Sequence, residues 1–115
     1  MKQLSSINIE IWDSEVDKKG ADYEKLYIEM LAASKDKKND KNVEIWWRLA
    51  KVTYLTSLDS LADGVVRAKT LLSYDYADKA VRVDRENFQA NLWLAITTGK
   101  MSIIELDVKQ RTKLN

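Results

Sequence analysis

Residues 43–56 read VEIWWRLAKVTYLT and constrain the fold of this chain more than any other segment. At helical spacing the segment has two apolar or aromatic faces. The first face holds Trp46, Leu49, Ala50 and Thr53. The neighbouring face holds Trp47, Lys51, Tyr54 and Leu58. Because one partner helix covers only one face, we expect this helix to lie in the middle of a stack or to line a binding surface.

The scarcity of turn-forming residues predicts an all-α chain. The 115 residues include only three glycines and no proline, whereas strand-rich domains need frequent turns that draw heavily on both. This length is enough for one core but not for two. We therefore expect residues 1–115 to form a single helical domain.

Apolar spacing and capping residues predict six helices, over residues 7–19, 23–35, 42–58, 65–83, 88–98 and 102–112. Gly20 and Gly99 are expected to end helices, and Asn87 is expected to cap the fifth. Ser102 and Glu105 have capping-box spacing, which predicts the start of the sixth. Six helices with short connections suggest three antiparallel pairs.

The residue types that usually carry catalysis and metal binding are missing. The chain has no histidine and no cysteine, so the commonest general base and the thiolate ligands are excluded. Glu10, Asp13 and Asp17 share one helix face, a group that could bind a hard cation, but a solvated face is the simpler interpretation. We predict a non-enzyme with no catalytic residue, cofactor, metal ion or small-molecule substrate.

The charge is close to balanced overall but uneven along the chain. The net charge of +1 argues against a nucleic-acid partner, since such domains are usually strongly basic. Residues 35–58 nevertheless carry six basic against three acidic side chains, and residues 99–115 carry four against two. No apolar run approaches ~18 residues, so we expect no membrane span.

Several short motifs resemble tetratricopeptide repeats. Residues 18–26 read KKGADYEKL, similar to the corner between the two helices of that repeat. Trp46-x-x-Leu49-Ala50 matches the start of its first helix, and residues 80–84, AVRVD, match its exit. Arg85 stands where proline is usual. The resemblance implies a short right-handed array of three stacked pairs, either complete here or part of a longer array.

A more specific resemblance, to the regulator of microtubule dynamics family, covers residues 22–100. It rests on DYEKLYIEMLAASK at 22–35, NVEIWWRLAKVTY at 42–54, YADKAVRVD at 76–84 and ENFQANLWLAI at 86–96. The four segments occur in the family's order. The resemblance implies a cytoplasmic, cytoskeletal protein whose partner is the microtubule or tubulin, with the spindle or spindle pole as the setting.

Repeat geometry would place a concave groove along the first helix of each pair. The positions that map onto this candidate groove are Glu44, Trp47, Lys51, Tyr54, Leu92 and Ile96. An exposed Trp47 beside a cation would be a typical anchor for a partner. The alternative is that Trp47 packs on the first helix pair as a core residue.

Two binding hypotheses follow. Tubulin tails are acidic, so a candidate tubulin-facing basic patch could contact them through Lys35, Lys37, Lys38, Lys41, Lys109, Arg111 and Lys113. Alternatively, the chain is a general scaffold that grips a peptide or helix of another protein in the aromatic groove. The first contact would weaken with salt, whereas the second would survive it.

Overall fold

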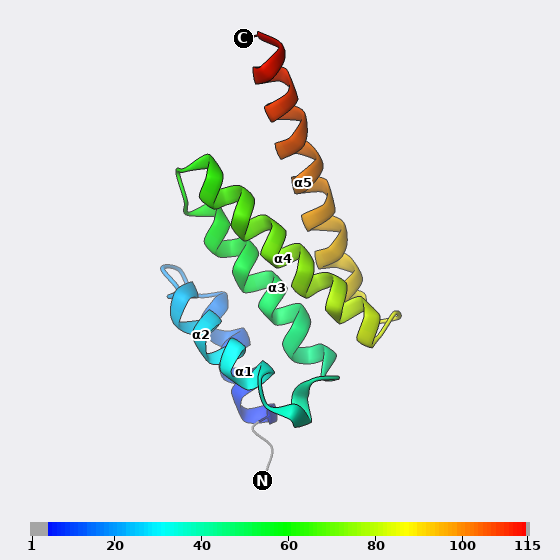
Figure 1. The fold of residues 1–115 in the computed structure, drawn as a ribbon. Coiled ribbons are helices and arrows are strands. Elements are labelled where there is room, and N and C mark those ends of the chain that lie inside the picture. The colour runs from blue at the N-terminus through cyan, green and yellow to red at the C-terminus, as the bar shows by residue number, and fades with distance from the viewer. Residues whose placement is uncertain (1–4, 115) are drawn as a thin grey trace.

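The computed structural model describes residues 5–114, with side chains described for residues 9–113. Within this range the chain is all-helical, with five α-helices, one 3-10 turn and no strand (Figure 1). Their order is α1 Ser5–Val16, α2 Tyr23–Ser34, η1 Lys37–Asn39, α3 Val43–Leu58, α4 Asp63–Val83 and α5 Phe88–Leu114. Residues 1–4 and 115, which the single-domain prediction includes, lie outside the described range.

Short polar side chains set the starts of three helices. Asp22 accepts a hydrogen bond from the backbone N–H three residues on at 3.1 Å, and Asn42 accepts one two residues on at 3.1 Å. Asn87 accepts the backbone N–H of Ala90 at 2.9 Å. These bonds satisfy N–H groups that have no partner inside the helix. Gly20, at a φ of 76°, allows the turn after α1 that a residue with a Cβ would adopt only under strain.

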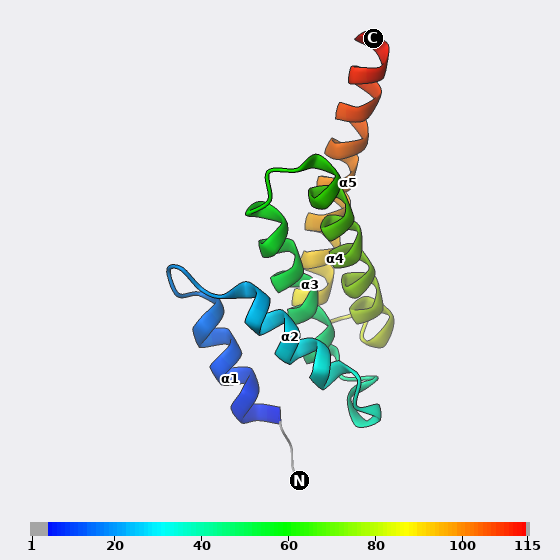
Figure 2. The same ribbon diagram turned by 60° about the vertical axis from the view of Figure 1, so that its left-hand side comes forward.

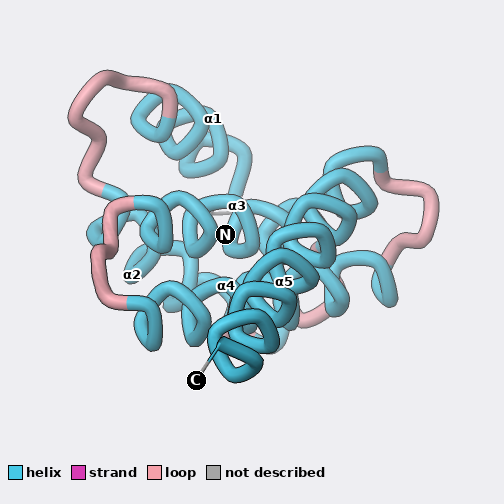
Figure 3. The backbone as a smooth tube through the Cα atoms, turned by 90° about the horizontal axis from the view of Figure 1, so that it is seen from above, coloured by secondary structure: helices cyan, strands magenta, loops and turns pink. Residues whose placement is uncertain are grey.

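Helix α3 lies in the middle of the molecule, with both faces covered by its own chain. Figure 3 shows α1 and α2 on one side of it and α5 on the other. One face belongs to a cluster with α1 and α2 that contains Trp12, Val16, Leu26, Met30, Ile45, Leu49 and Val52. The other joins Trp47 to Ala80 and Ala90 in α4 and α5. Of the two places expected for this helix, among other helices or along a binding surface, the first is the one observed.

Small residues bring α3 and α4 close together. Ala50, Ser73 and Ala77 are fully buried, and the Ser73 hydroxyl donates a hydrogen bond to the carbonyl oxygen of Ala50 at 2.5 Å. Around these small residues the helices approach closely, and they run side by side over most of their length (Figure 2). The small residue that the repeat motif places at position 50 thus lies at this close approach.

The predicted break at Gly99 and the separate sixth helix are wrong, because α5 runs unbroken from Phe88 to Leu114. The Ser102 hydroxyl donates to the carbonyl oxygen of Thr98 at 3.1 Å, one turn back, as it would within a helix. A glycine inside a helix costs only about 1 kcal/mol relative to alanine. The contacts of this second half with α4, including an ion pair of 2.8 Å between Arg67 and Glu105, hold the helix in register past the glycine.

Several other helix boundaries differ from the prediction by one to three residues. Helix α1 ends at Val16 rather than residue 19, and α4 begins at Asp63 rather than residue 65. The connection between the second and third predicted helices contains the 3-10 turn η1. The prediction of a third antiparallel pair is also wrong, because α5 alone occupies the place of the predicted fifth and sixth helices.

Candidate functional site

The site predicted on α3 is built around Trp47, which its own chain covers. Its side chain is 7% exposed and packs with Ala80 and Ala90, so it lies against α4 and α5 rather than against the first helix pair. The indole Nε1 donates to Glu44 Oε1 at 3.1 Å. The guanidinium of Arg48 lies over the ring at 4.1 Å from its centroid. This arrangement leaves little of the indole for a partner to contact.

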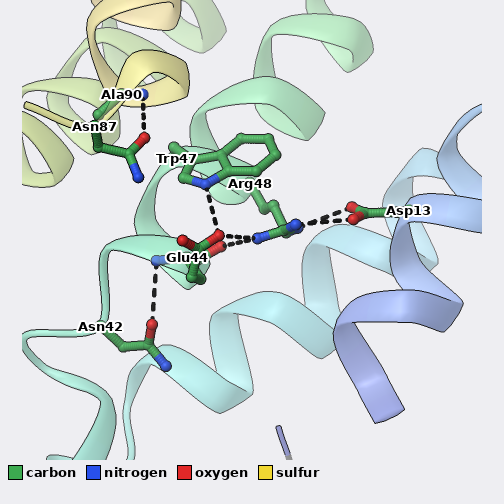
Figure 4. Close-up of polar contacts among 7 residues, drawn as sticks. All are labelled: Asp13, Asn42, Glu44, Trp47, Arg48, Asn87 and Ala90. Carbon is green, nitrogen blue, oxygen red and sulfur yellow. Dashed lines mark hydrogen bonds and ion pairs between the residues drawn. The ribbon is translucent and has the colours of Figure 1, made fainter. Parts of the chain in front are cut away.

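Arg48 ties α1 to α3 (Figure 4). Its Nε and Nη2 donate to the two carboxylate oxygens of Asp13, each at 2.8 Å, in the bidentate geometry that suits a guanidinium. Its Nη1 donates to the carboxylate and the backbone carbonyl of Glu44 at 2.8 and 2.9 Å. Burial lowers the pKa of Arg48, but the hydrogen bonds that it donates to Asp13 and Glu44 outweigh this effect, so its pKa is raised. Arg48 therefore keeps its positive charge where α1 meets α3.

Lys51 repeats the same link one turn further along α3. Its Nζ lies 3.8 Å from the carboxylate of Asp17, the residue that follows the end of α1. The pairing differs in strength from that of Arg48, because the Asp17 side chain is 78% exposed and surface ion pairs contribute little. Of the three acids considered as a solvated helix face, Asp13 and Asp17 are thus paired with cations of α3.

The predicted groove positions that remain partly exposed lie at the far end of α3 and in the first half of α5. The rings of Tyr54 and Trp93 lie 5.8 Å apart between centroids, and both are half-buried. Leu92 is 37% exposed, and Ile96 is half-buried. The structure therefore brings Tyr54 toward the α5 residues, while Glu44 and Trp47 are engaged with Arg48.

Sequence reasoning missed Arg48, Asp13 and Trp93 as parts of this region. A signal for the first two was present, because Asp13 and Asp17 are four residues apart and Arg48 and Lys51 are three apart, so each pair lies on one helix face. Matching charge spacing on two helices is compatible with their packing together. No comparable signal singled out Trp93, whose indole Nε1 is buried without a hydrogen-bond partner within the described residues.

Trp46 occupies a different environment from Trp47. It is half-buried, and its indole Nε1 donates to the carbonyl oxygen of Asp40 at 2.8 Å. Its ring lies 6.2 Å from that of Tyr76 and 5.3 Å from the ammonium of Lys79. Trp46 thereby anchors the connection between α2 and α3 against α4.

The seven basic residues predicted to face tubulin form two groups at opposite ends of the molecule. Lys35, Lys37, Lys38 and Lys41 lie at the connection between α2 and α3, at the bottom of Figure 1, whereas Lys109, Arg111 and Lys113 lie near the end of α5 at the top. All seven are exposed. Arg111 pairs with Asp63 at 2.8 Å. The four lysines of the first group have no carboxylate within 4.0 Å in the part of the chain that the structure describes.

The acids in the first basic group are already engaged. Asp36 accepts the backbone N–H of Lys38 at 3.0 Å, which caps η1, and Asp40 lies 3.4 Å from the ammonium of Lys79. The 3-10 turn that Asp36 caps holds its lysines on the surface. This connection, which we call the lysine connection (residues 35–41), therefore offers an anionic partner several cations at once.

Within the described range no helix combines the length and the apolar character needed to cross a membrane.

The fold and the site together define an all-helical protein whose central helix is joined to α1 by the hydrogen bonds of Arg48. The sequence model of a family described as regulator of microtubule dynamics protein 1-3 matches residues 9–114, which is nearly the whole chain. The chain belongs to this family, and the resemblance noted over residues 22–100 is confirmed. No curated protein and no solved structure matches the chain at a significant level. The family supports a role in microtubule dynamics.

Proposed function

We propose that this chain regulates microtubule dynamics as a non-catalytic protein that binds the acidic tails of tubulin through the lysine connection. The observation that carries the proposal is a set of four exposed lysines on the connection between α2 and α3, which have no carboxylate within 4.0 Å among the described residues. Family membership supplies the partner, and the charges supply the means of attachment. A disordered acidic tail can lie across several such cations without a preformed pocket.

The arrangement of the two basic groups favours the lysine connection over the end of α5. Arg111 is held by Asp63, and Asp107 lies among the other cations of that helix end. In the lysine connection, Asp36 accepts the capping hydrogen bond and Asp40 pairs with Lys79, so neither acid pairs with the lysines of the connection. We therefore assign the main contact to residues 35–41 and a lesser one to residues 109–113.

The remaining parts of the proposal concern the scaffold and the setting. We propose that the helices stack in the right-handed sense of tetratricopeptide-like repeats, with α1–α2 and α3–α4 as successive hairpins; the small residues where α3 meets α4 support this. A cytoplasmic protein on the spindle or spindle pole would meet the partner that the family implies.

Co-sedimentation with polymerised tubulin tests the proposal with three charge-matched variants. The first changes Lys35, Lys37 and Lys38 to Glu, and the second changes Lys109, Arg111 and Lys113 to Glu. The control changes Lys19, Lys25 and Arg85 to Glu, three exposed cations outside both groups. We expect the first variant to lose most of its binding, the second to lose less, and the control to bind nearly as the unchanged protein. Equal losses in all three would show only a response to net charge and would contradict the assignment.

A second candidate function is a scaffold that grips a peptide or helix between α3 and α5. The half-buried rings of Tyr54 and Trp93 beside the exposed Leu92 favour it. Such binding would persist in moderate salt, because apolar contacts are not screened. Tyr54→Ala and Leu92→Ser would abolish it while leaving binding through the lysine connection unchanged.

A further inference from the structure

An open groove of about 620 Å³ runs between the middle of α4 and the second half of α5. Its walls are mostly apolar and include Leu71, Tyr74, Met101 and Leu106. Leu71 is 43% exposed and Leu106 is 55% exposed. No described part of the chain covers this groove. Exposed apolar residues that line one concave surface are typical of a contact site.

The polar residues at the end of the groove come from one helix and have opposite charges. Glu105 and Lys109 both line it and lie one turn apart on α5. In an isolated helix they would favour each other at this spacing. Here Glu105 turns toward Arg67, with hydrogen bonds of 3.0 and 2.8 Å. Lys109 has no carboxylate within 4.0 Å among the described residues.

This pattern is self-complementary. If a second α5 lies antiparallel across the first, with a two-fold axis level with residue 107 along the helix, each Glu105 faces the Lys109 of the other copy. The same rotation brings the exposed Leu106 of each copy within a turn of the Leu106 of the other. A two-fold contact requires one surface to match itself in this way, whereas an unrelated partner would need no such symmetry.

From this geometry we propose that the groove between α4 and α5 is an interface between two copies of this chain, packed antiparallel along α5. The apolar residues around Leu71 and Leu106 form its centre, and the two Glu105–Lys109 pairs form its rim. The interface leaves the lysine connection of each copy free, because that connection lies at the other end of the molecule (Figure 1). Two copies would present two lysine connections, so avidity would strengthen the attachment to a polymer that repeats its tails.

Sedimentation equilibrium over a concentration series tests the interface without tubulin. We expect the unchanged protein to shift from monomer to dimer with rising concentration. Glu105→Lys alone and Lys109→Glu alone should both remain monomeric, since each places like charges across the axis. When these two single variants are mixed, one copy carries a cation at both positions and the other carries a carboxylate at both. Opposite charges then face each other across the axis again, so the mixture should dimerise.

The apolar centre has a matched control. Leu106→Ser should weaken dimerisation at least tenfold, whereas Ile28→Ser, which removes a similarly exposed side chain from α2, should not change it. An unchanged protein that remains monomeric throughout the series would overturn the proposal. So would a mixture of the charge variants that stays monomeric while the unchanged protein dimerises. A protein that stays monomeric but binds an apolar dye in a Leu106-dependent way would also overturn it, and would assign the groove to a different occupant.

Discussion

The two ends of the helix stack bury side chains of different size. The end made by α1, α2 and one face of α3 contains large apolar side chains, with Trp12, Leu26 and Leu49 at 4% exposed or less. At the other end, the helices α4 and α5 themselves bury small residues, and Ala80 and Ala90 pack against Trp47 of α3. The fully buried positions of these two helices are Thr70, Ser73, Ala77, Ala80, Ala90 and Thr97. Their larger side chains remain exposed, as Leu71, Ile103 and Leu106 show.

Because of this difference, we expect one end to contribute most of the folding stability and the other to provide the surface for association. Large buried side chains remove more apolar area from water and so contribute more to folding. Small residues allow close helix approach but contribute less, and they leave apolar side chains on the outside, where another surface can cover them. We infer that the first end holds the fold together and that the second end is the one available to a partner.

The largest expected effect belongs to the core of the first end. Leu49 is fully buried in the cluster around Trp12, so Leu49→Ala should lower the free energy of unfolding by about 2–5 kcal/mol. Leu106→Ala, at the second end, should change it by no more than about 0.5 kcal/mol when measured where the chain is monomeric. Urea unfolding of both variants provides the comparison. Similar losses would break the proposed contrast between the ends.

A smaller loss of folding stability is expected at the hydrogen bonds through which Arg48 joins α1 to α3. Arg48→Met should lower the free energy of unfolding by about 1–3 kcal/mol, because it removes charged hydrogen bonds to Asp13 and Glu44. The coupling of Arg48 to Asp13 alone should be about 1 kcal/mol, since the Asp13 side chain is 46% exposed and screened by solvent. A double-mutant cycle with Asp13→Asn measures this coupling. Zero coupling would mean that α1 is held by apolar packing alone.

The smallest expected effect on the free energy of unfolding lies at the boundary between the two ends. There Tyr27 of α2 contacts Tyr76 of α4. Their hydroxyl groups lie 2.9 Å apart, and burial together with this bond raises the pKa of Tyr76. An unfolded tyrosine has a pKa of ~10. The folded state therefore retains the proton that the unfolded state loses, so stability is complete below about pH 10 and falls as the pH rises above it.

Tyr76→Phe should make the fall above about pH 10 shallower, because phenylalanine cannot ionise in the unfolded state. Thermal unfolding at a series of pH values, with Tyr74→Phe as the control, measures the change. Identical slopes for Tyr76→Phe and the unchanged protein would show that Tyr76 does not contribute to the alkaline loss of stability.

Local signals in the sequence predicted most of the fold. The cap at Asn87 predicted the start of α5, because a cap acts on the next turn alone. The two apolar faces of α3 predicted a central place or a binding surface, and the helix lies in the centre. The same kind of local signal failed at Gly99 and Ser102, because contacts with α4, which are distant in sequence, favour a continuous helix.

The environment of the two tryptophans was harder to predict. Trp46 and Trp47 are neighbours about 100° apart around one helix, and the sequence alone does not say which direction points to α1 and which to α5. Trp47 is the more buried residue because Ala80 and Ala90 pack on one side of it and Glu44 and Arg48 cover another. Such a cover depends on where Asp13 lies, and therefore on the packing of α1.

The most direct test of the proposed function uses microtubules with and without the acidic tails of tubulin, which limited proteolysis removes. The unchanged protein should co-sediment with intact microtubules and lose most of that binding on tail-less ones, and raising the salt concentration should have the same effect on intact microtubules. Equal binding to both kinds of microtubule, with no response to salt, would contradict the account and would favour an apolar contact through Tyr54 and the first half of α5.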